Sequence, residues 1–281
     1  MSMHARHKLG EVIVWIVLIL LAIYTIAPLL FLLVNSFKSN SEIVGNPVAL
    51  PSKWTLEYIL NAVKEINFGT SIVITFLITF ISVALIVVTS SLCAWAMIRV
   101  KSKASTLIFY AFTASMLIPF QSVMYPLISE FDTFNLKNIP GLILMYGGFG
   151  LSMSIFLYHG FMKSVPKSLE EAAVLDGART FQMFFQVVFP LVKGTTVTDI
   201  VLNAKWIWND YLLPFLVIGN SDGVMTLTLE LYFAKLTSGQ YGNPWQLIFP
   251  AVFVTIIPII ILYIFLQKYI IKAGADGAVK Y

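Results

Sequence analysis

The sequence has little charge and only one cysteine. Asp, Glu, Lys and Arg make up 11% of its 281 residues, whereas soluble globular proteins carry about 25%. This low charge, with 58% hydrophobic residues and a mean hydropathy of +0.86, excludes a water-soluble enzyme, a nucleic-acid binder and a disordered chain. Cys93 has no second cysteine to pair with, which excludes internal disulfides and cysteine metal clusters. The composition predicts a membrane protein.

Long intervals without charged residues locate the membrane spans, because a spanning helix needs about 20 mostly apolar residues. Five such intervals occur, at residues 12–37, 66–98, 104–129, 138–162 and 236–267. A sixth segment, 194–218, is apolar in bulk but contains Asp199, Lys205 and Asp210. The first interval is longer than the roughly 7–15 residues of a signal-peptide core, so we expect a retained span. We predict one all-α membrane domain with six transmembrane helices, at about residues 12–36, 70–98, 104–128, 138–161, 194–218 and 246–267.

The basic residues indicate the orientation, since Lys and Arg accumulate on the cytoplasmic side of membrane proteins. With six spans, twelve basic residues lie on the side of the two termini and five on the opposite side, with Lys205 inside a span. We therefore expect both termini, the loop 163–190 and the tail 268–281 to be cytoplasmic.

The long cytoplasmic loop 163–190 has the pattern of two short helices. Ser168 and Glu171 have capping-box spacing at the start of the first helix, and Gly177 can adopt the positive φ that ends it. The residues expected to form the narrow apolar face of this helix are Leu169, Ala172 and Ala173. Such a helix followed by a glycine turn is typical of a docking surface, although a purely structural loop would show the same spacing.

A second amphipathic helix is predicted from Thr180 to Pro190. Its apolar residues recur at helical spacing, and Gln182 and Gln186 lie on the other face. The predicted apolar residues are Phe181, Phe184, Phe185 and Val188.

The identity of these residues adds a resemblance. Glu171-Ala172-Ala173, three residues, Gly177 and, after nine more, a segment ending in Pro190 resemble the EAA loop of bacterial ABC importer permeases. Val187 and Phe189 stand where that pattern has isoleucine and leucine. Outside the loop, two segments look like the shorter, six-span permease subunit of maltose-type carbohydrate importers, although the chain ends in Tyr281 rather than the common glycine. They are Trp208-Asn209-Asp210 with Pro214, and Gly277-Ala278-Val279-Lys280.

The resemblance implies a type I ABC importer permease fold in the bacterial cytoplasmic membrane. It implies as partners a second, longer permease subunit, a cytoplasmic ATPase dimer and an extracellular or periplasmic solute-binding protein, with lipid around the spans. Glu171 would meet a basic residue of the ATPase, and Gly177 would let the helix seat. The chain has no phosphate-binding glycine loop, so we expect no enzyme activity and no cofactor here, with ATP and Mg on the partner. The expected coupling residues are Glu171, Ala172, Ala173, Asp176, Gly177 and Pro190.

Polar groups in the fifth span are candidates for the substrate pathway. Ionisable groups in a bilayer need partners or water, and a mixture of aromatic and polar side chains suits a sugar. Asp199 and Asp210 could instead pair between helices, and aromatic residues could anchor the span at the interface. His159 has no nearby ligand set, so we expect no metal site. The candidate pathway residues are Asn203, Lys205, Trp206, Trp208, Asn209, Asp210 and Tyr211.

Other functions stay open at this point. The importer could carry a non-sugar solute such as a peptide, an amino acid or a glycerol phosphate-like polyol, because the EAA loop is shared across import classes. The chain could also be an intramembrane enzyme or a secondary transporter that uses Asp199, Lys205 and Asp210 as a proton relay.

Overall fold

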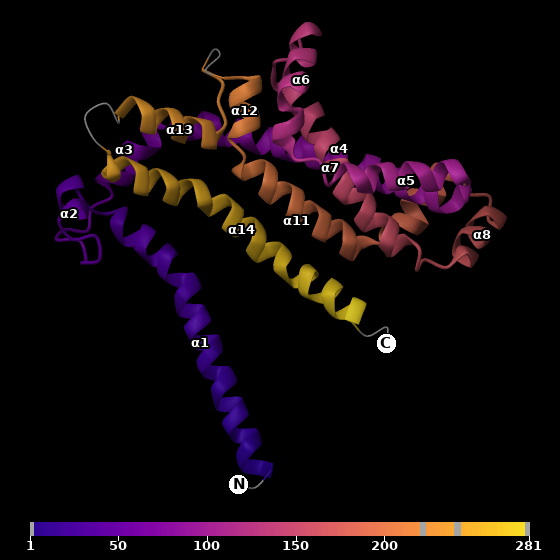
Figure 1. Ribbon diagram of the computed structural model, residues 1–281, viewed down its shortest axis with the longest axis horizontal. Helices are drawn as coiled ribbons and strands as arrows, with labels where there is room; N and C mark the ends of the chain where they lie inside the picture. The colour runs from indigo at the N-terminus through magenta and orange to yellow at the C-terminus, as the bar shows by residue number, and fades with distance from the viewer. Residues whose placement is uncertain (1–2, 220–222, 239–242, 279–281) are drawn as a thin grey trace. The chain divides into compact units, whose positions relative to one another are not determined.

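The computed structural model describes residues 3–219, 223–238 and 243–278, and every regular element in those ranges is a helix (Figure 1). The predicted all-α class is confirmed. Within the described ranges, four helices are long and apolar enough to cross a membrane, or up to six if each of two bent pairs is one span. The helices divide between two compact units, residues 1–69 with 230–257 and residues 70–229 with 258–281.

In the first unit, polar contacts fix the conformation of the loop at residues 38–52. Lys38 is 1% exposed and donates to the carbonyls of Asn46 and Pro47 at 3.2 and 3.1 Å. Hydrogen bonds from Ser52 and Ser39 hold the pKa of Glu42 at about 2, which keeps it ionised at the start of a short helix. The elements here are α1 (Met3–Asn35), α2 (Asn40–Gly45), α3 (Glu57–Glu65), most of α13 (Leu227–Ser238) and the first part of α14 (Trp245–Ala278).

The second unit contains the predicted coupling loop and the candidate pathway residues. In Figure 1, α8 lies at the end of this unit where α5 begins. The unit contains α4 (Phe68–Val100), α5 (Lys103–Ser115), α6 (Phe120–Thr133), α7 (Ile139–Met162), α8 (Lys167–Leu175), α9 (Thr180–Met183), the π-helix η1 (Phe184–Val188), α10 (Phe189–Leu191), α11 (Lys193–Asn209), α12 (Leu212–Val217) and the rest of α14.

Small residues let α4, α7 and α11 approach closely. A Cβ added to Gly150 would overlap the side chain of Ile86 and lie 3.0 Å from Oδ1 of Asn203, and one at Gly147 would lie 2.8 Å from Leu85. The buried face of α4 is likewise rich in serine and threonine. Close approach of small residues is how helices associate where both the core and the surroundings are apolar.

Two of the predicted spans are not single straight helices. The third is broken into α5 and α6, bent by 105°, with Pro119 preceding the first residue of α6. The fifth is divided into α11 and α12 at Asp210 and Tyr211. In addition, α14 continues beyond residue 267 to Ala278, through most of the predicted tail. The limits of the spans and their orientation stay predictions.

Candidate functional site

The first helix of the predicted docking loop begins at Lys167, two residues earlier than a capping box at Ser168 requires. Pro166 is the N-cap of α8, with φ −62° and ψ 131°, and no side chain caps it. Ser168 is already inside the helix, where its hydroxyl cannot act as the N-cap. The predicted Ser168–Glu171 capping box is therefore wrong. Proline is tolerated at this position because it has no N–H that needs a partner.

The side of α8 that packs against the protein carries an acid. Glu170 is 7% exposed, and Ala173 is buried beside it, whereas Leu169 and Ala172 are exposed. Leu169, Ala172 and Ala173 share one face of the helix, as their spacing predicts, but only Ala173 of the three is buried within this chain. A buried carboxylate needs a cation and hydrogen bonds to offset its lost hydration, and this residue has both.

Arg99 and Trp95, at the end of α4, bind the buried Glu170. Nε of Arg99 donates to the two carboxylate oxygens at 2.8 and 3.0 Å, and its Nη2 forms an ion pair with Oε1. Nε1 of Trp95 donates to Oε2 at 3.2 Å. These contacts fix α8 to the end of α4. Sequence reasoning missed all three residues, because Arg99 was counted only as an indicator of orientation.

The exposed surface of α8, next to the Glu170–Arg99 pair, presents one acid with large apolar neighbours. Glu171, Val174 and Leu175 are exposed, Leu175 to 89%. They border a hollow of about 530 Å³, whose other lining residues are Trp95, Arg99, Lys167, Glu170 and Met183. An exposed apolar patch beside a carboxylate suits a protein partner with an apolar cleft and a basic residue. We call Glu171, Val174 and Leu175 the outer face of α8.

The turn after α8 has the geometry that the glycine predicts. Gly177 has φ +81°, and a Cβ added there would have no heavy atom within 4 Å. Asp176 is the C-cap and is exposed, and the N–H of Ala178 donates to the carbonyl of Ala173 at 2.9 Å. Glycine is favoured here by its backbone conformation and not by lack of space.

The second predicted helix begins at Thr180 as expected, but it changes form. After α9 the chain forms the π-helix η1, and then α10, which contains Pro190. Phe184 and Val188 are buried against α4 and α7, while Phe181 and Phe185 are exposed. Two of the four residues of the predicted apolar face, Phe184 and Val188, are therefore buried within this chain, and the other two are exposed.

The fifth predicted span contains a buried polar cluster. Asp199 is 0% exposed, and its Oδ1 accepts hydrogen bonds from Ser154 at 2.6 Å and from Nδ2 of Asn203 at 3.0 Å. The same Nδ2 also contacts Oγ of Ser154 at 3.1 Å. The cluster joins α7 to α11, which agrees with the packing role left open for Asp199.

Asp210 lies at the break between α11 and α12. Its Oδ2 accepts a hydrogen bond from the hydroxyl of Tyr146 at 3.0 Å, and Oδ1 accepts from the N–H of Leu212 at 3.0 Å. Its own carbonyl accepts from Thr228 at 2.7 Å. Asp210 therefore stabilises the backbone where the helix ends.

Two of the candidate pathway residues line a common hollow. Asn203 and Trp206, on α11, border a space of about 790 Å³ together with residues of α5, α6 and α7. Trp206 is 40% exposed and stacks edge-on with Tyr146, ring centroids 5.4 Å apart. Trp208 lies instead in an apolar groove with α4 and α14. The remaining exposed candidates are Lys205, Asn209 and Tyr211.

Comparison with known proteins gives a family and a fold. Residues 86–273 match the family described as "Binding-protein-dependent transport system inner membrane component". A crystal structure of a bacterial ABC transporter that imports the acidic polysaccharide alginate has a chain with the same fold, at a TM-score of 0.80 and 21% identity, covering 96% of this chain and 98% of that one.

Curated relatives match over nearly the full length. A probable starch degradation products transport system permease protein, AmyC of Thermoanaerobacterium thermosulfurigenes, is 41% identical and covers 93% of this chain and 94% of its own. The multiple sugar-binding transport system permease protein MsmG of Streptococcus mutans is 31% identical over 99% of this chain and 100% of its own.

Proposed function

The chain belongs to the family of inner membrane components of binding-protein-dependent transport systems, and from this premise we propose that it is the permease subunit of an ATP-driven importer of sugars or oligosaccharides. Family membership makes it a multi-pass protein of the inner membrane and a transport subunit rather than an enzyme. It also implies an ATPase and a binding protein as partners.

A saccharide is the best-supported cargo. The relatives that match over most of the chain are named for starch degradation products and for multiple sugars. A third, from Bacillus subtilis, is named for melibiose, raffinose and stachyose and is 30% identical over 90% of this chain. These names favour a sugar over the peptide, amino acid or polyol alternatives.

The observation that carries the coupling role is the two-sided character of α8. Its buried side is fixed to α4 through Glu170, Arg99 and Trp95, while its outer face leaves an acid and two large apolar side chains for a partner. A helix held in this way transmits the movement of an ATPase to α4 as a rigid body. In this proposal Glu171 meets a basic residue of the ATPase. The other coupling residues, Ala172, Ala173, Asp176, Gly177 and Pro190, shape the loop around it.

The hollow bordered by Asn203 and Trp206 is the proposed contribution of this subunit to the substrate pathway. A carboxamide and an indole are groups that bind sugar hydroxyls and rest against the apolar face of a pyranose ring. The second, longer permease would complete the pathway. An ATPase dimer would hold ATP and Mg, so we expect no cofactor on this chain.

Gly177→Ala is expected to reduce ATPase stimulation by the binding protein severalfold, while Gly177→Asn retains most of it. Alanine at φ +81° costs about 1–2 kcal/mol, whereas asparagine tolerates this region better. Because nothing lies within 4 Å of the added Cβ, size alone cannot explain a difference between the two variants. If both variants lose ATPase stimulation equally, as measured on the reconstituted complex, backbone conformation is not the reason for glycine at this position.

Trp206→Ala is expected to raise the KM for the transported saccharide about five- to tenfold, with a smaller effect on kcat. Loss of one aromatic stacking surface removes about 1 kcal/mol of binding. Trp15→Ala is the matched control, since Trp15 is an exposed tryptophan on α1 outside the hollow. Uptake of a panel of oligosaccharides into proteoliposomes measures KM and kcat for both variants. An unchanged KM for Trp206→Ala would remove Trp206 from the pathway.

A further inference from the structure

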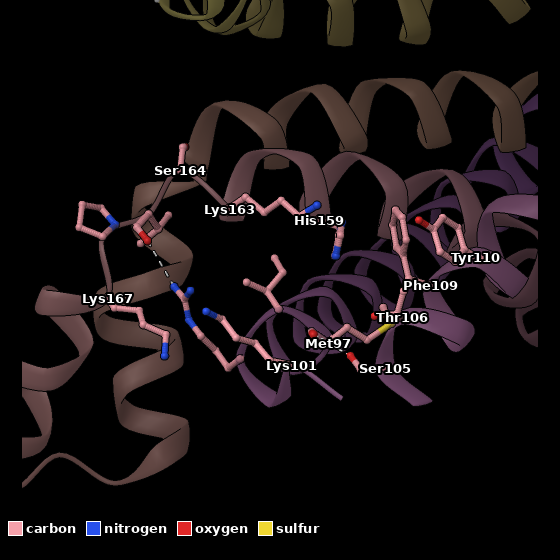
Figure 2. Close-up of a pocket in the computed structure, with 14 residues that line it drawn as sticks. Met97, Lys101, Ser105, Thr106, Phe109, Tyr110, His159, Lys163, Ser164 and Lys167 are labelled. Atoms are coloured by element: carbon pink, nitrogen blue, oxygen red, sulfur yellow. Dashed lines mark hydrogen bonds between the residues drawn. The ribbon is translucent and has the colours of Figure 1, made fainter. Parts of the chain in front are cut away.

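A second cavity, separate from the hollow at Asn203 and Trp206, lies where α4 ends, α5 begins and α7 meets α8. Its volume is about 800 Å³. Figure 2 shows Lys101, from the turn between α4 and α5, and Lys163 and Lys167, from the connection between α7 and α8, around it. Together with Arg99 they give its wall four basic side chains, and none of the described residues that line it is acidic. The cavity therefore has a strongly positive wall.

The charge of the three lysines is not neutralised within the described part of the chain. The two ion pairs found there are Arg99 with Glu170 and Lys137 with Asp132, so the arginine is already paired and the lysines are not. The helices α5 and α8 also start at this cavity, with Ser105 and Pro166 among the lining residues. The positive ends of both helix dipoles add to the attraction for an anion.

The rest of the wall is amphipathic. Ser105 and Thr106 also line the cavity, while Phe109 stacks on His159 with ring centroids 3.8 Å apart (Figure 2). On the outside of α5, next to this wall, Leu107 is 70% exposed and Ile108 is also exposed. A site with a basic interior and an apolar exterior, at the end of predicted spans, matches a molecule with an anionic head and apolar chains.

We propose that this cavity binds the phosphate headgroup of an anionic phospholipid from the cytoplasmic leaflet, with the acyl chains along α5. The headgroup would lie between Lys101, Lys163 and Lys167, at the point where α8 meets the membrane-embedded helices. The site adds a lipid contact beside the coupling helix, and it does not depend on which solute the transporter carries. A free phosphate shares the headgroup chemistry, so the test includes both.

The test uses the complete importer, purified in detergent and delipidated, and titrated with dioleoyl phosphatidylglycerol or dioleoyl phosphatidylcholine. Native mass spectrometry counts the bound lipid. We expect the protein to bind phosphatidylglycerol on the order of a hundredfold more tightly than phosphatidylcholine, since each of the three lysines contributes about a fivefold preference. Lys101→Gln/Lys163→Gln is expected to reduce this preference to about fivefold, the contribution of the remaining Lys167.

The control variant is Lys103→Gln/Lys64→Gln. It lowers the net charge by the same amount, and Lys103 is two residues from Lys101 but outside the cavity lining. It is expected to keep the preference. All four lysines are exposed, so neither variant removes a packing contact of the core. If the cavity variant fails to assemble, the single variants Lys101→Gln and Lys163→Gln are measured instead. The ratio of phosphatidylglycerol to phosphatidylcholine affinity in the wild type then also tests the proposal.

Three results would overturn the proposal. The first is equal binding of the two lipids by the wild type. The second is an equal loss of the preference for phosphatidylglycerol in the control and cavity variants. The third is displacement by millimolar inorganic phosphate or glycerol 3-phosphate without any lipid preference, which would assign the cavity to a soluble anion. Sugar uptake is not measured in this experiment. A failure of the lipid proposal therefore leaves the proposed transport function untouched, and a failure of the transport function leaves the lipid proposal untouched.

Discussion

Replacing Arg99 with alanine is expected to abolish coupling between ATP hydrolysis and transport. The substitution leaves the Glu170 carboxylate, 7% exposed, without its cation, and breaking a buried ion pair in this way costs about 3–5 kcal/mol. We expect α8 to detach from the end of α4, so that stimulation of the ATPase by the binding protein falls at least tenfold. The measurement is ATPase activity of the reconstituted complex with and without binding protein.

The double variant Arg99→Leu/Glu170→Leu distinguishes the effect of an unpaired buried carboxylate from general misfolding. Removing both charges leaves no orphaned carboxylate, and a buried pair replaced by apolar residues is often neutral. We therefore expect the double variant to regain much of the stimulation. Lys137→Ala is the matched control, because the pair of Lys137 with Asp132 is exposed, with an N–O distance of 3.9 Å, and such pairs contribute about 0–1 kcal/mol. A double variant as defective as Arg99→Ala would contradict this account of α8.

Reversing the charge at Glu171 is expected to prevent productive docking of the ATPase. Glu171 is exposed on the outer face of α8, so Glu171→Arg leaves the fold intact but replaces attraction with repulsion. A charge-assisted hydrogen bond contributes about 1.5–3 kcal/mol, which corresponds to a loss of roughly 10–150-fold in the affinity of the ATPase. Co-purification of the ATPase with the permease, followed over a salt series, measures this loss.

Glu57→Arg provides the control for that experiment. Glu57 is an exposed acid in the first turn of α3, a nine-residue helix like α8. It lies between the first two predicted spans, on the side of the membrane opposite to the cytoplasmic termini in the predicted topology. The control is expected to bind the ATPase as the unchanged protein does. If Glu171→Arg retains the ATPase and full transport, Glu171 does not make the coupling contact.

The features that could be predicted from the sequence are those with local causes. Charge-free intervals predict apolar helices because the length of a span is set by the bilayer. Gly177 was recognised because a residue with positive φ commonly ends a helix, and its φ of +81° agrees. The start of the second loop helix at Thr180 was predicted from its apolar spacing and agrees with α9.

The features that were missed depend on contacts between distant residues. Glu170 and Glu171 are adjacent acids, and only the position of Arg99, 71 residues earlier in the chain, determines which of them is buried. The break at Asp210 depends in the same way on Tyr146 from α7. Likewise η1 is a local departure from the α-helix within an apolar run, and helical periodicity cannot indicate it.

The most direct measurement of the central claim is saccharide uptake into proteoliposomes that contain the complete importer, loaded with ATP or left without it. Saccharide should accumulate only with internal ATP and binding protein, and uptake should survive collapse of the proton gradient. It should fall with Glu171→Arg while the complex stays inserted in the membrane. Accumulation that follows the proton gradient without ATP, or no uptake of any saccharide in the panel, would contradict the assignment of an ATP-driven sugar importer.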